Sequence, residues 1–119
     1  SYADAAKERL LGVPSDLLER HGAVSADTVC AMARGALAVS GAGLALSISG
    51  IAGPDGGTPD KPVGTVWIAT ARSGAPPEAV ACRFSGNRDA VRRKAAVAGL
   101  LAVACGAAGR PFLDTPVTW

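Results

Sequence analysis

The stretch from residue 49 to residue 67 reads SGIAGPDGGTPDKPVGTVW. It joins two apolar runs of β-like composition, residues 44–48 and 66–69, and it places five glycines and three prolines between Gly50 and Gly64. Glycine leaves backbone N–H groups open to a ligand, and proline stiffens the chain. We therefore expect two strands joined by a stiff loop that suits an anion packed against main chain.

The length of this loop favours a functional interpretation. Long connections in compact domains are functional or disordered, and apolar Ile51 and Val63 at its ends argue against disorder. The alternative is an ordinary connection that tolerates glycine and proline. The loop matches neither the P-loop pattern nor the GxGxxG pattern, so those two nucleotide-binding motifs are excluded.

The sequence on both sides of the loop predicts an alternation of helices and strands. Apolar residues at helical spacing, Ser25 as an N-cap and glycine stop signals predict helices at residues 3–11, 14–22, 26–40 and 88–108. Apolar runs predict strands at residues 44–49, 64–71 and 78–84, the last two as an antiparallel hairpin. Helices on either side of a sheet make a layered α/β fold.

The ends of the chain suggest that the domain has further parts. Three strands make a thin sheet, residue 1 is a serine, and Met32 is the single methionine. We therefore expect that sequence is missing before Ser1. Residues 1–109 are expected to form one domain, and residues 110–119 an extended surface tail. The uncharged run 95–109 is too short to span a bilayer and predicts a buried helix.

Composition excludes several classes of protein. A net charge of +2 gives no broad basic surface of the kind that nucleic-acid binders show. The three cysteines, Cys30, Cys82 and Cys105, are odd in number and far apart, which argues against a disulfide framework and against a zinc site. We expect buried free thiols in a reducing cytoplasm. There is no apolar leader segment at the start of the sequence, and no membrane association is expected.

Five segments together resemble one family, the CinA C-terminal domain family of nicotinamide-nucleotide amidases (PncC). The glycine-rich stretch is similar to the signature of that family, and SYADAAK at residues 1–7 resembles its Tyr-Ser-Asn-Glu-Ala-Lys stretch. Three more matches follow in the same order: LGV at 11–13, HGAVS at 21–25 and FSGNRDAVR at 84–92. The resemblance runs from residue 1 to about residue 105.

The resemblance implies a fold and an activity. The implied fold is a three-layer α/β/α sandwich with a mixed sheet, in a protein that forms homodimers. The implied reaction is hydrolysis of the carboxamide of nicotinamide mononucleotide to nicotinic acid mononucleotide and ammonia, a step of pyridine nucleotide salvage. Neither a metal nor an organic cofactor is implied.

The resemblance also implies roles for particular residues. It assigns an active-site tyrosine to Tyr2 and a lysine base to Lys7. It assigns substrate binding to the loop and to the start of the last helix, at Ser49, Gly50, Gly53, Gly56, Gly57, Thr58 and Arg88. Arg88 is the candidate for the phosphate, because a helix N-terminus and a guanidinium both favour an anion.

Each of these residues has a simpler interpretation. Without the resemblance, Lys7 reads as a solvated helix residue paired with Asp4, and Trp67 reads as a core residue, with ring stacking on a pyridine as the alternative. His21 reads as part of a helix C-terminus rather than as a catalytic base. Beside Arg88, the simpler expectation is a solvated face that pairs with Asp89 and comprises Arg92, Arg93 and Lys94. We adopt it for Arg93 and Lys94, whereas for Arg88 we keep the phosphate role that the resemblance implies.

One departure from the family pattern decides what residues 1–119 are expected to do alone. In the family, two serine-bearing regions precede the equivalent of Tyr2: an Ala-Glu-Ser-Cys-Thr-Gly-Gly motif and, some residues later, a glycine- and serine-rich turn. The resemblance places both of them before Ser1, so it implies that the serine nucleophile, the first strand and the first helix are missing from residues 1–119. We therefore expect the chain alone to be inactive as an amidase. The rival hypothesis is a catalytically inactive module that binds a nucleotide or phosphate, or that serves in an interaction.

Overall fold

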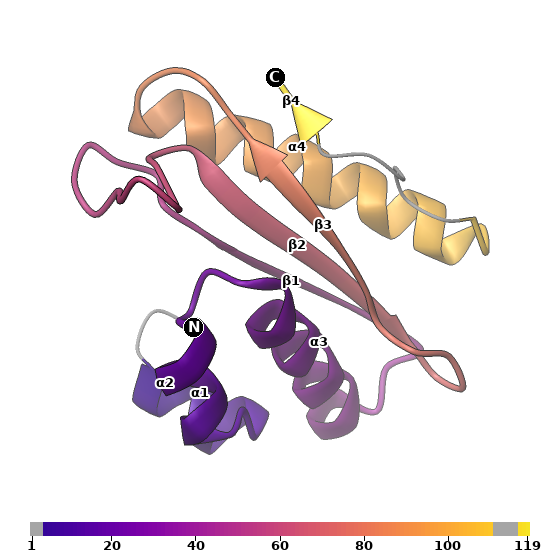
Figure 1. Cartoon of the computed structure of the whole chain (residues 1–119). Coiled ribbons are helices and arrows are strands. Elements are labelled where there is room, and N and C mark those ends of the chain that lie inside the picture. Colours follow the sequence, from indigo (N-terminus) through magenta and orange to yellow (C-terminus); the bar gives the residue numbers. More distant parts are fainter. Residues whose placement is uncertain (1–3, 111–116) are drawn as a thin grey trace.

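The computed structural model describes residues 4–110 and 117–119 of the chain. In chain order the elements are α1 (Asp4–Leu11), α2 (Ser15–His21), α3 (Ala26–Ser40), β1 (Leu44–Gly50), β2 (Thr65–Arg72), β3 (Glu78–Arg83), α4 (Arg88–Ala107) and β4 (Val117–Thr118). The sheet lies between a layer formed by α1, α2 and α3 and a layer formed by α4 (Figure 1). The expected three-layer α/β/α sandwich is confirmed.

The sheet is mixed and has the order β1-β2-β3-β4. β1 and β2 are antiparallel, with Ile48 opposite Ile68, and β2 and β3 are antiparallel, with Ile68 opposite Val80. The hairpin expected at residues 64–84 is therefore confirmed. β4 pairs with β3 in the parallel direction, with Cys82 opposite Val117.

Local capping explains where the two long helices begin. The Ser25 side chain accepts a hydrogen bond from the Thr28 backbone N–H before α3, and Asn87 does the same with Ala90 before α4. Each bond satisfies one of the backbone donors that a helix N-terminus leaves without an intrahelical partner. α3 ends at Gly41, which adopts the left-handed conformation at φ 68°.

Strand β2 separates two hydrophobic clusters. On the α4 side, Val66 and Ile68 pack with Cys82, Phe84, Val91, Ala95, Ala98, Ala102 and Val117. On the α3 side, the buried members are Val29, Ala33, Ala69 and Ala71, and half-buried Trp67 packs against them. Alternation of side chains along one strand thus supplies both faces of the core. The expectation that Trp67 is a core residue is confirmed.

Helix α4 differs from the buried helix that its uncharged half predicts. Ala98 and Ala102 are buried against the sheet, but Val97, Leu100 and Leu101 are exposed, Leu100 by 72%. The prediction is wrong because the sheet covers only one side of the helix. Among the described residues, no helix has the length and the apolar composition that crossing a membrane requires.

The last residues of the chain return to the sheet. Val117 is buried in the cluster on the α4 side, and the Trp119 ring stacks on Phe84 at a centroid distance of 5.7 Å. The Ser85 backbone N–H donates to the Trp119 carbonyl oxygen at 2.9 Å. A surface position is therefore wrong for Val117, and an extended conformation is found for Val117–Thr118, whereas residues 111–116 of the expected tail lie outside the described residues. The expected boundary between a domain and a tail at residue 109 stays a prediction.

We predict that Ile68→Ala lowers the free energy of unfolding by about 2–5 kcal/mol, because it leaves a cavity at the centre of the sheet. Ile68 is 1% exposed. Urea unfolding followed by circular dichroism measures the change. Leu100→Ala is the control, since its side chain is mostly in solvent, and equal losses in the two variants would contradict this account of the core.

We predict that Cys82 is the slowest of the three thiols to react with iodoacetamide at pH 8. Burial raises the pKa of Cys82 from 9.0 to about 11, and alkylation requires the thiolate. Between these two values the unfolded state releases the thiol proton while the folded state keeps it, so stability decreases as the pH rises through that window. Peptide mass spectrometry measures the rates, and labelling of Cys82 as fast as the half-buried Cys105 would refute the prediction.

Candidate functional site

The glycine-rich loop, residues 51–64, connects β1 to β2 and is ordered by its own backbone. At its neck, the Ile51 N–H donates to the Thr65 carbonyl at 2.8 Å, and the Gly64 N–H donates to the Ile51 carbonyl at 2.7 Å. At its tip, the Thr58 N–H donates to the Lys61 carbonyl at 3.0 Å, and the Lys61 N–H donates to Thr58 Oγ1 at 3.0 Å. These hydrogen bonds confirm the expectation that the loop is ordered.

Gly64 shows why glycine is required at the neck of the loop. Its φ of +94° is in the region that favours glycine, and an added Cβ would lie 2.1 Å from the Phe84 carbonyl oxygen. Its carbonyl accepts from the Phe84 N–H at 2.9 Å, so the loop neck is fixed against the end of β3.

Arg88 joins the loop to helix α4. It is the first residue of α4, and its Nη1 donates to the Gly53 carbonyl oxygen at 3.1 Å. That bond uses one of the five N–H donors of a guanidinium. Arg88 therefore has a structural contact with the loop and keeps donor capacity for an anion.

A cavity of about 330 Å³ opens beside Arg88 on the α4 side of the sheet. It is lined by Ile48, Gly50, Ala52, Val66, Arg88, Val91, Arg92 and Ala95. Two arginines and an apolar wall contribute to this lining, whereas no acidic residue is among the described lining residues. Such a site suits an anionic ligand with an apolar portion.

Arg92 is a site residue that sequence reasoning missed. Arg92 is exposed, as the solvated face that it shares with Arg93 and Lys94 predicts, but it also lines the cavity one helical turn after Arg88. The i, i+4 spacing of the two arginines was the available signal. Lys94 also differs from the expectation, because its Nζ donates to the Ser85 carbonyl at 2.8 Å. No ion pair to Asp89 occurs within the part of the chain that the structure describes.

Lys7 lies in the other helical layer. It is in α1, which packs against α2 and α3, and it is buried with 4% exposure. Its Nζ is 3.7 Å from Asp4 Oδ1. The solvated position that its surroundings in the sequence predict is therefore wrong, whereas the pairing with Asp4 is confirmed. A buried ammonium or amine is unusual and is a candidate for chemistry.

The close packing of α1 on α3 fixes the position of Lys7. An added Cβ on Gly35 of α3 would lie 1.8 Å from the Leu11 carbonyl oxygen at the end of α1. The Val13 N–H also donates to the Lys7 carbonyl at 3.1 Å. The Lys7 carbonyl, in the middle of α1, is thus bonded to the connection between α1 and α2.

The residues predicted for the site are distributed over two faces of the sheet. Ser47 in β1 donates from its hydroxyl to the Val29 carbonyl of α3, so Ser49, two residues further on, faces the same layer. Gly50 lines the cavity on the opposite face, together with Arg88. Gly53 is buried at its contact with Arg88.

The other predicted residues lie at the loop tip or outside the description. Gly56, Gly57 and Thr58 are exposed at the tip of the loop. Tyr2 lies outside the described residues. The structure therefore brings Gly50, Gly53 and Arg88 together, and it places Lys7 in a different layer. The roles assigned to these residues stay predictions.

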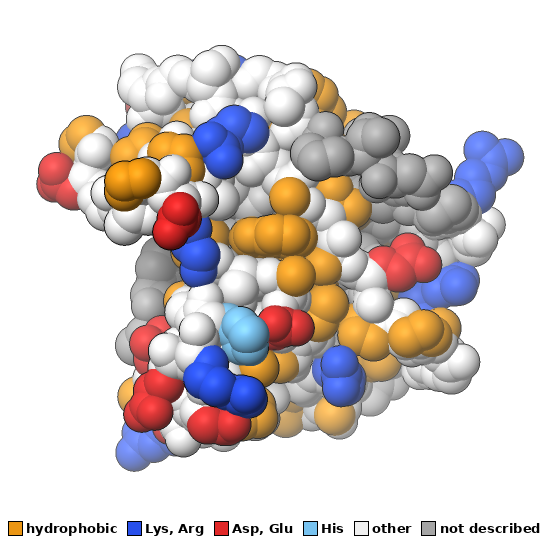
Figure 2. Space-filling model, viewed as in Figure 1, with side chains coloured by type: hydrophobic (Ala, Val, Ile, Leu, Met, Phe, Trp, Pro, Cys, Tyr) orange, Lys and Arg blue, Asp and Glu red, His pale blue; other side chains and the backbone are white. Residues whose placement is uncertain are grey.

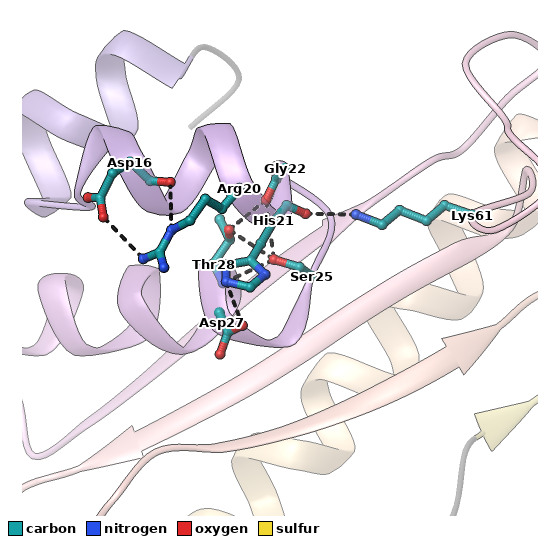
Figure 3. A network of polar contacts seen from close by, with 8 residues as sticks. All are labelled: Asp16, Arg20, His21, Gly22, Ser25, Asp27, Thr28 and Lys61. Atoms are coloured by element: carbon teal, nitrogen blue, oxygen red, sulfur yellow. Dashed lines mark hydrogen bonds and ion pairs between the residues drawn. The ribbon is translucent and has the colours of Figure 1, made fainter.

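A second polar contact connects the loop to the α2–α3 junction. Lys61 Nζ donates to the His21 carbonyl oxygen at 2.8 Å (Figure 3). His21 is the last residue of α2, as expected, and Gly22 is the capping residue. His21 Nε2 is 3.4 Å from Asp27 Oδ2. Sequence reasoning missed Lys61, although it stands inside the stretch that identifies the loop.

Charged side chains of both signs gather over α1 and α2 on the face seen in Figure 2. One of the contacts in this layer is the exposed pair of Arg20 with Asp16 at 3.1 Å. Among the described residues, no three His, Cys, Asp or Glu side chains lie close enough together to hold a metal ion.

Comparison with known proteins identifies relatives that match most of the chain. A model of the CinA C-terminal domain family matches residues 1–105. A CinA-like protein of Geobacter sulfurreducens is 58% identical over 101 residues, which are 84% of this chain and 24% of that protein. The nicotinamide-nucleotide amidohydrolase PncC of Pseudomonas putida is 51% identical over 100 residues, covering 84% of this chain and 62% of that protein.

A solved structure agrees with the fold. A competence-damaged protein (CinA) superfamily protein of Klebsiella pneumoniae matches with a TM-score of 0.84 and 38% identity, over 91% of this chain and 67% of that chain. The chain thus spans about a quarter of the length of the CinA-like relative and less than two thirds of the PncC relative. The family resemblance predicted from the five sequence segments is confirmed.

We predict that Gly35→Ala destabilises the protein by about 1–3 kcal/mol, because its methyl group would force α1, with Lys7, away from α3. Gly43→Ala is the matched control, since nothing lies within 4 Å of an added Cβ there. Urea unfolding measures both variants. A Gly35→Ala protein as stable as Gly43→Ala would show that the contact between α1 and α3 is not tight.

Proposed function

The chain belongs to the CinA C-terminal domain family, and we propose that it binds nicotinamide mononucleotide for hydrolysis to nicotinic acid mononucleotide and ammonia. The observation that carries the proposal is the cavity beside the glycine-rich loop, where Arg88 and Arg92 face an apolar wall. The PncC name of one relative supports the same substrate. Homodimer formation, which the family resemblance implies, stays a prediction.

The cavity supports recognition of the phosphate. Arg88 and Arg92 are one turn apart at the start of α4, where the helix dipole also favours an anion. A guanidinium binds phosphate through two parallel N–H donors. The apolar side chains of Ile48 and Val66 give the rest of the ligand a surface to pack on.

The chemistry requires groups from more than the cavity. Amide hydrolysis proceeds by attack of a serine hydroxyl on the carboxamide carbon, departure of ammonia and attack of water on the acyl intermediate. We assign the base that takes the serine proton to Lys7, and the serine to one of the two serine-bearing regions of the family that residues 1–119 do not contain. The loop contacts α4 through Gly53 and α2 through Lys61. A substrate lying along it can therefore place its phosphate at α4 and its carboxamide toward the other layer.

A second candidate is nucleotide binding without turnover. None of the described residues that line the cavity is a serine, cysteine, lysine or histidine. Residues 1–119 can therefore supply binding without supplying the attacking group. Ammonia release separates the two candidates, because only hydrolysis produces it.

We predict that Arg88→Ala weakens binding of nicotinamide mononucleotide more than about tenfold, because a charge-assisted contact worth about 1.5–3 kcal/mol is lost. Isothermal titration calorimetry on the 119-residue chain measures the affinity. Arg92→Ala is expected to weaken binding as well, and it leaves the contact between Arg88 and Gly53 in place.

Arg93→Ala is the matched control, because Arg93 is exposed on the same helix and does not line the cavity. If neither Arg88→Ala nor Arg92→Ala changes the affinity, the assignment of the phosphate to these two arginines is wrong. In the full-length protein, ammonia release from nicotinamide mononucleotide is expected, with loss in Lys7→Ala. Binding without ammonia release there would favour the second candidate.

A further inference from the structure

Lys61 occupies a fixed position at the tip of the glycine-rich loop. The backbone of Lys61 exchanges two hydrogen bonds with Thr58, one through the Thr58 N–H and one through the Thr58 hydroxyl. This turn directs the side chain out of the loop toward α2 (Figure 3). Its Nζ donates to the His21 carbonyl at 2.8 Å, across 40 positions of sequence. The contact is therefore a tertiary one.

The accepting end of this contact is rigid. The His21 carbonyl lies at the C-terminus of α2, where the helix dipole favours a cation. The next residue, Gly22, is held by Thr28, whose hydroxyl donates to the Gly22 carbonyl at 2.6 Å, and Thr28 is fully buried. The Ser25 hydroxyl also donates to the Gly22 carbonyl, at 3.2 Å. Lys61 thus attaches the loop to a junction that the buried core already fixes.

The loop is held from two layers by two cations. Arg88 of α4 donates to the Gly53 carbonyl on one side of the loop, and Lys61 donates to the His21 carbonyl on the other. Residues 54–60 between these contacts are exposed to solvent. Within the described part of the chain, Lys61 forms no ion pair, so a carboxylate partner does not explain its position.

We propose that Lys61 is a positioning residue that clamps the glycine-rich loop to the α2–α3 junction and so sets the backbone that the nucleotide meets. The inference rests on the proposed function for its substrate, and on the hydrogen bonds above for its mechanism. Lys61 acts through the loop backbone and does not touch the reacting atoms. With the clamp in place, the backbone N–H groups of the tip are ordered before the ligand arrives, which lowers the cost of binding.

The test compares Lys61→Met with Lys61→Arg and Lys94→Met. Lys61→Met keeps the length and the apolar stem but removes the donor, whereas Lys61→Arg restores it. Lys94→Met is the matched control, because the Nζ of Lys94 also donates to a backbone carbonyl at 2.8 Å, that of Ser85 outside the glycine-rich loop. Two readouts are taken on the 119-residue chain: amide hydrogen exchange of residues 51–64 and the affinity for nicotinamide mononucleotide.

We expect Lys61→Met to raise hydrogen exchange in residues 51–64 by about tenfold and to weaken nucleotide binding by about three- to tenfold, as loss of one charge-assisted bond would. Exchange in α3 should not change. Lys61→Arg is expected to restore both values, and Lys94→Met to leave both within about twofold of the starting protein, in line with the small effects of surface substitutions.

Unchanged exchange in the loop of Lys61→Met would overturn the clamp. Faster exchange with unchanged affinity would overturn its role in positioning the nucleotide. If the unmodified chain does not bind nicotinamide mononucleotide at all, the proposed function fails, and the exchange measurement still decides whether Lys61 holds the loop.

Discussion

Burial of strand β2 on both faces is the constraint on which the rest of this structure depends. Val66 and Ile68 face α4, while Trp67, Ala69 and Ala71 face α3. A strand that is apolar on both sides is stable only when each side is covered, so helices must lie above and below it. The glycine-rich loop leaves the end of this sandwich between the two helical layers, which is why its contacts come from both.

The contacts that order the loop are made largely to main-chain atoms. Arg88 and Lys61 both donate to carbonyl oxygens, and the neck of the loop is closed by backbone hydrogen bonds. An ammonium or guanidinium bonded to a neutral carbonyl retains its full positive charge. The loop is therefore bordered by positive charge on both sides while its tip remains exposed, which is an arrangement suited to an anionic ligand.

Much of the fold could be predicted because its signals are local. Ser25 and the glycine after Ser40 mark the two ends of α3, and alternation in residues 78–84 marks β3. The errors concern properties that depend on distant residues. Lys7 is buried because α1 packs on Gly35 of α3. Val117 is buried because the two residues of β4 pair with the edge of β3. A two-residue strand has no periodicity to detect.

The candidate site was predictable to a smaller extent than the fold. The family resemblance identified Arg88 and the loop, but the cations that follow Arg88 on α4 differ in their surroundings. Arg92 lines the cavity, whereas Lys94 donates to the Ser85 carbonyl. The spacing of Arg92 and Lys94 on one helix is known from the sequence, whereas the groups that they contact depend on where β1 and β3 end. Lys61 was overlooked because its acceptor is a backbone atom, which leaves no complementary residue in the sequence.

The use of backbone carbonyls as acceptors has a consequence for how the sequence of the protein can evolve. A salt bridge constrains two positions at once, so its two residues tend to be exchanged together. The bonds from Lys61 and Arg88 each depend on one side chain, since the accepting carbonyl belongs to the backbone. Position 53 is restricted to glycine for separate reasons, its φ of +88° and the Val63 side chain 2.6 Å from an added Cβ. Because neither attachment needs a complementary side chain, analysis of paired substitutions would not find them.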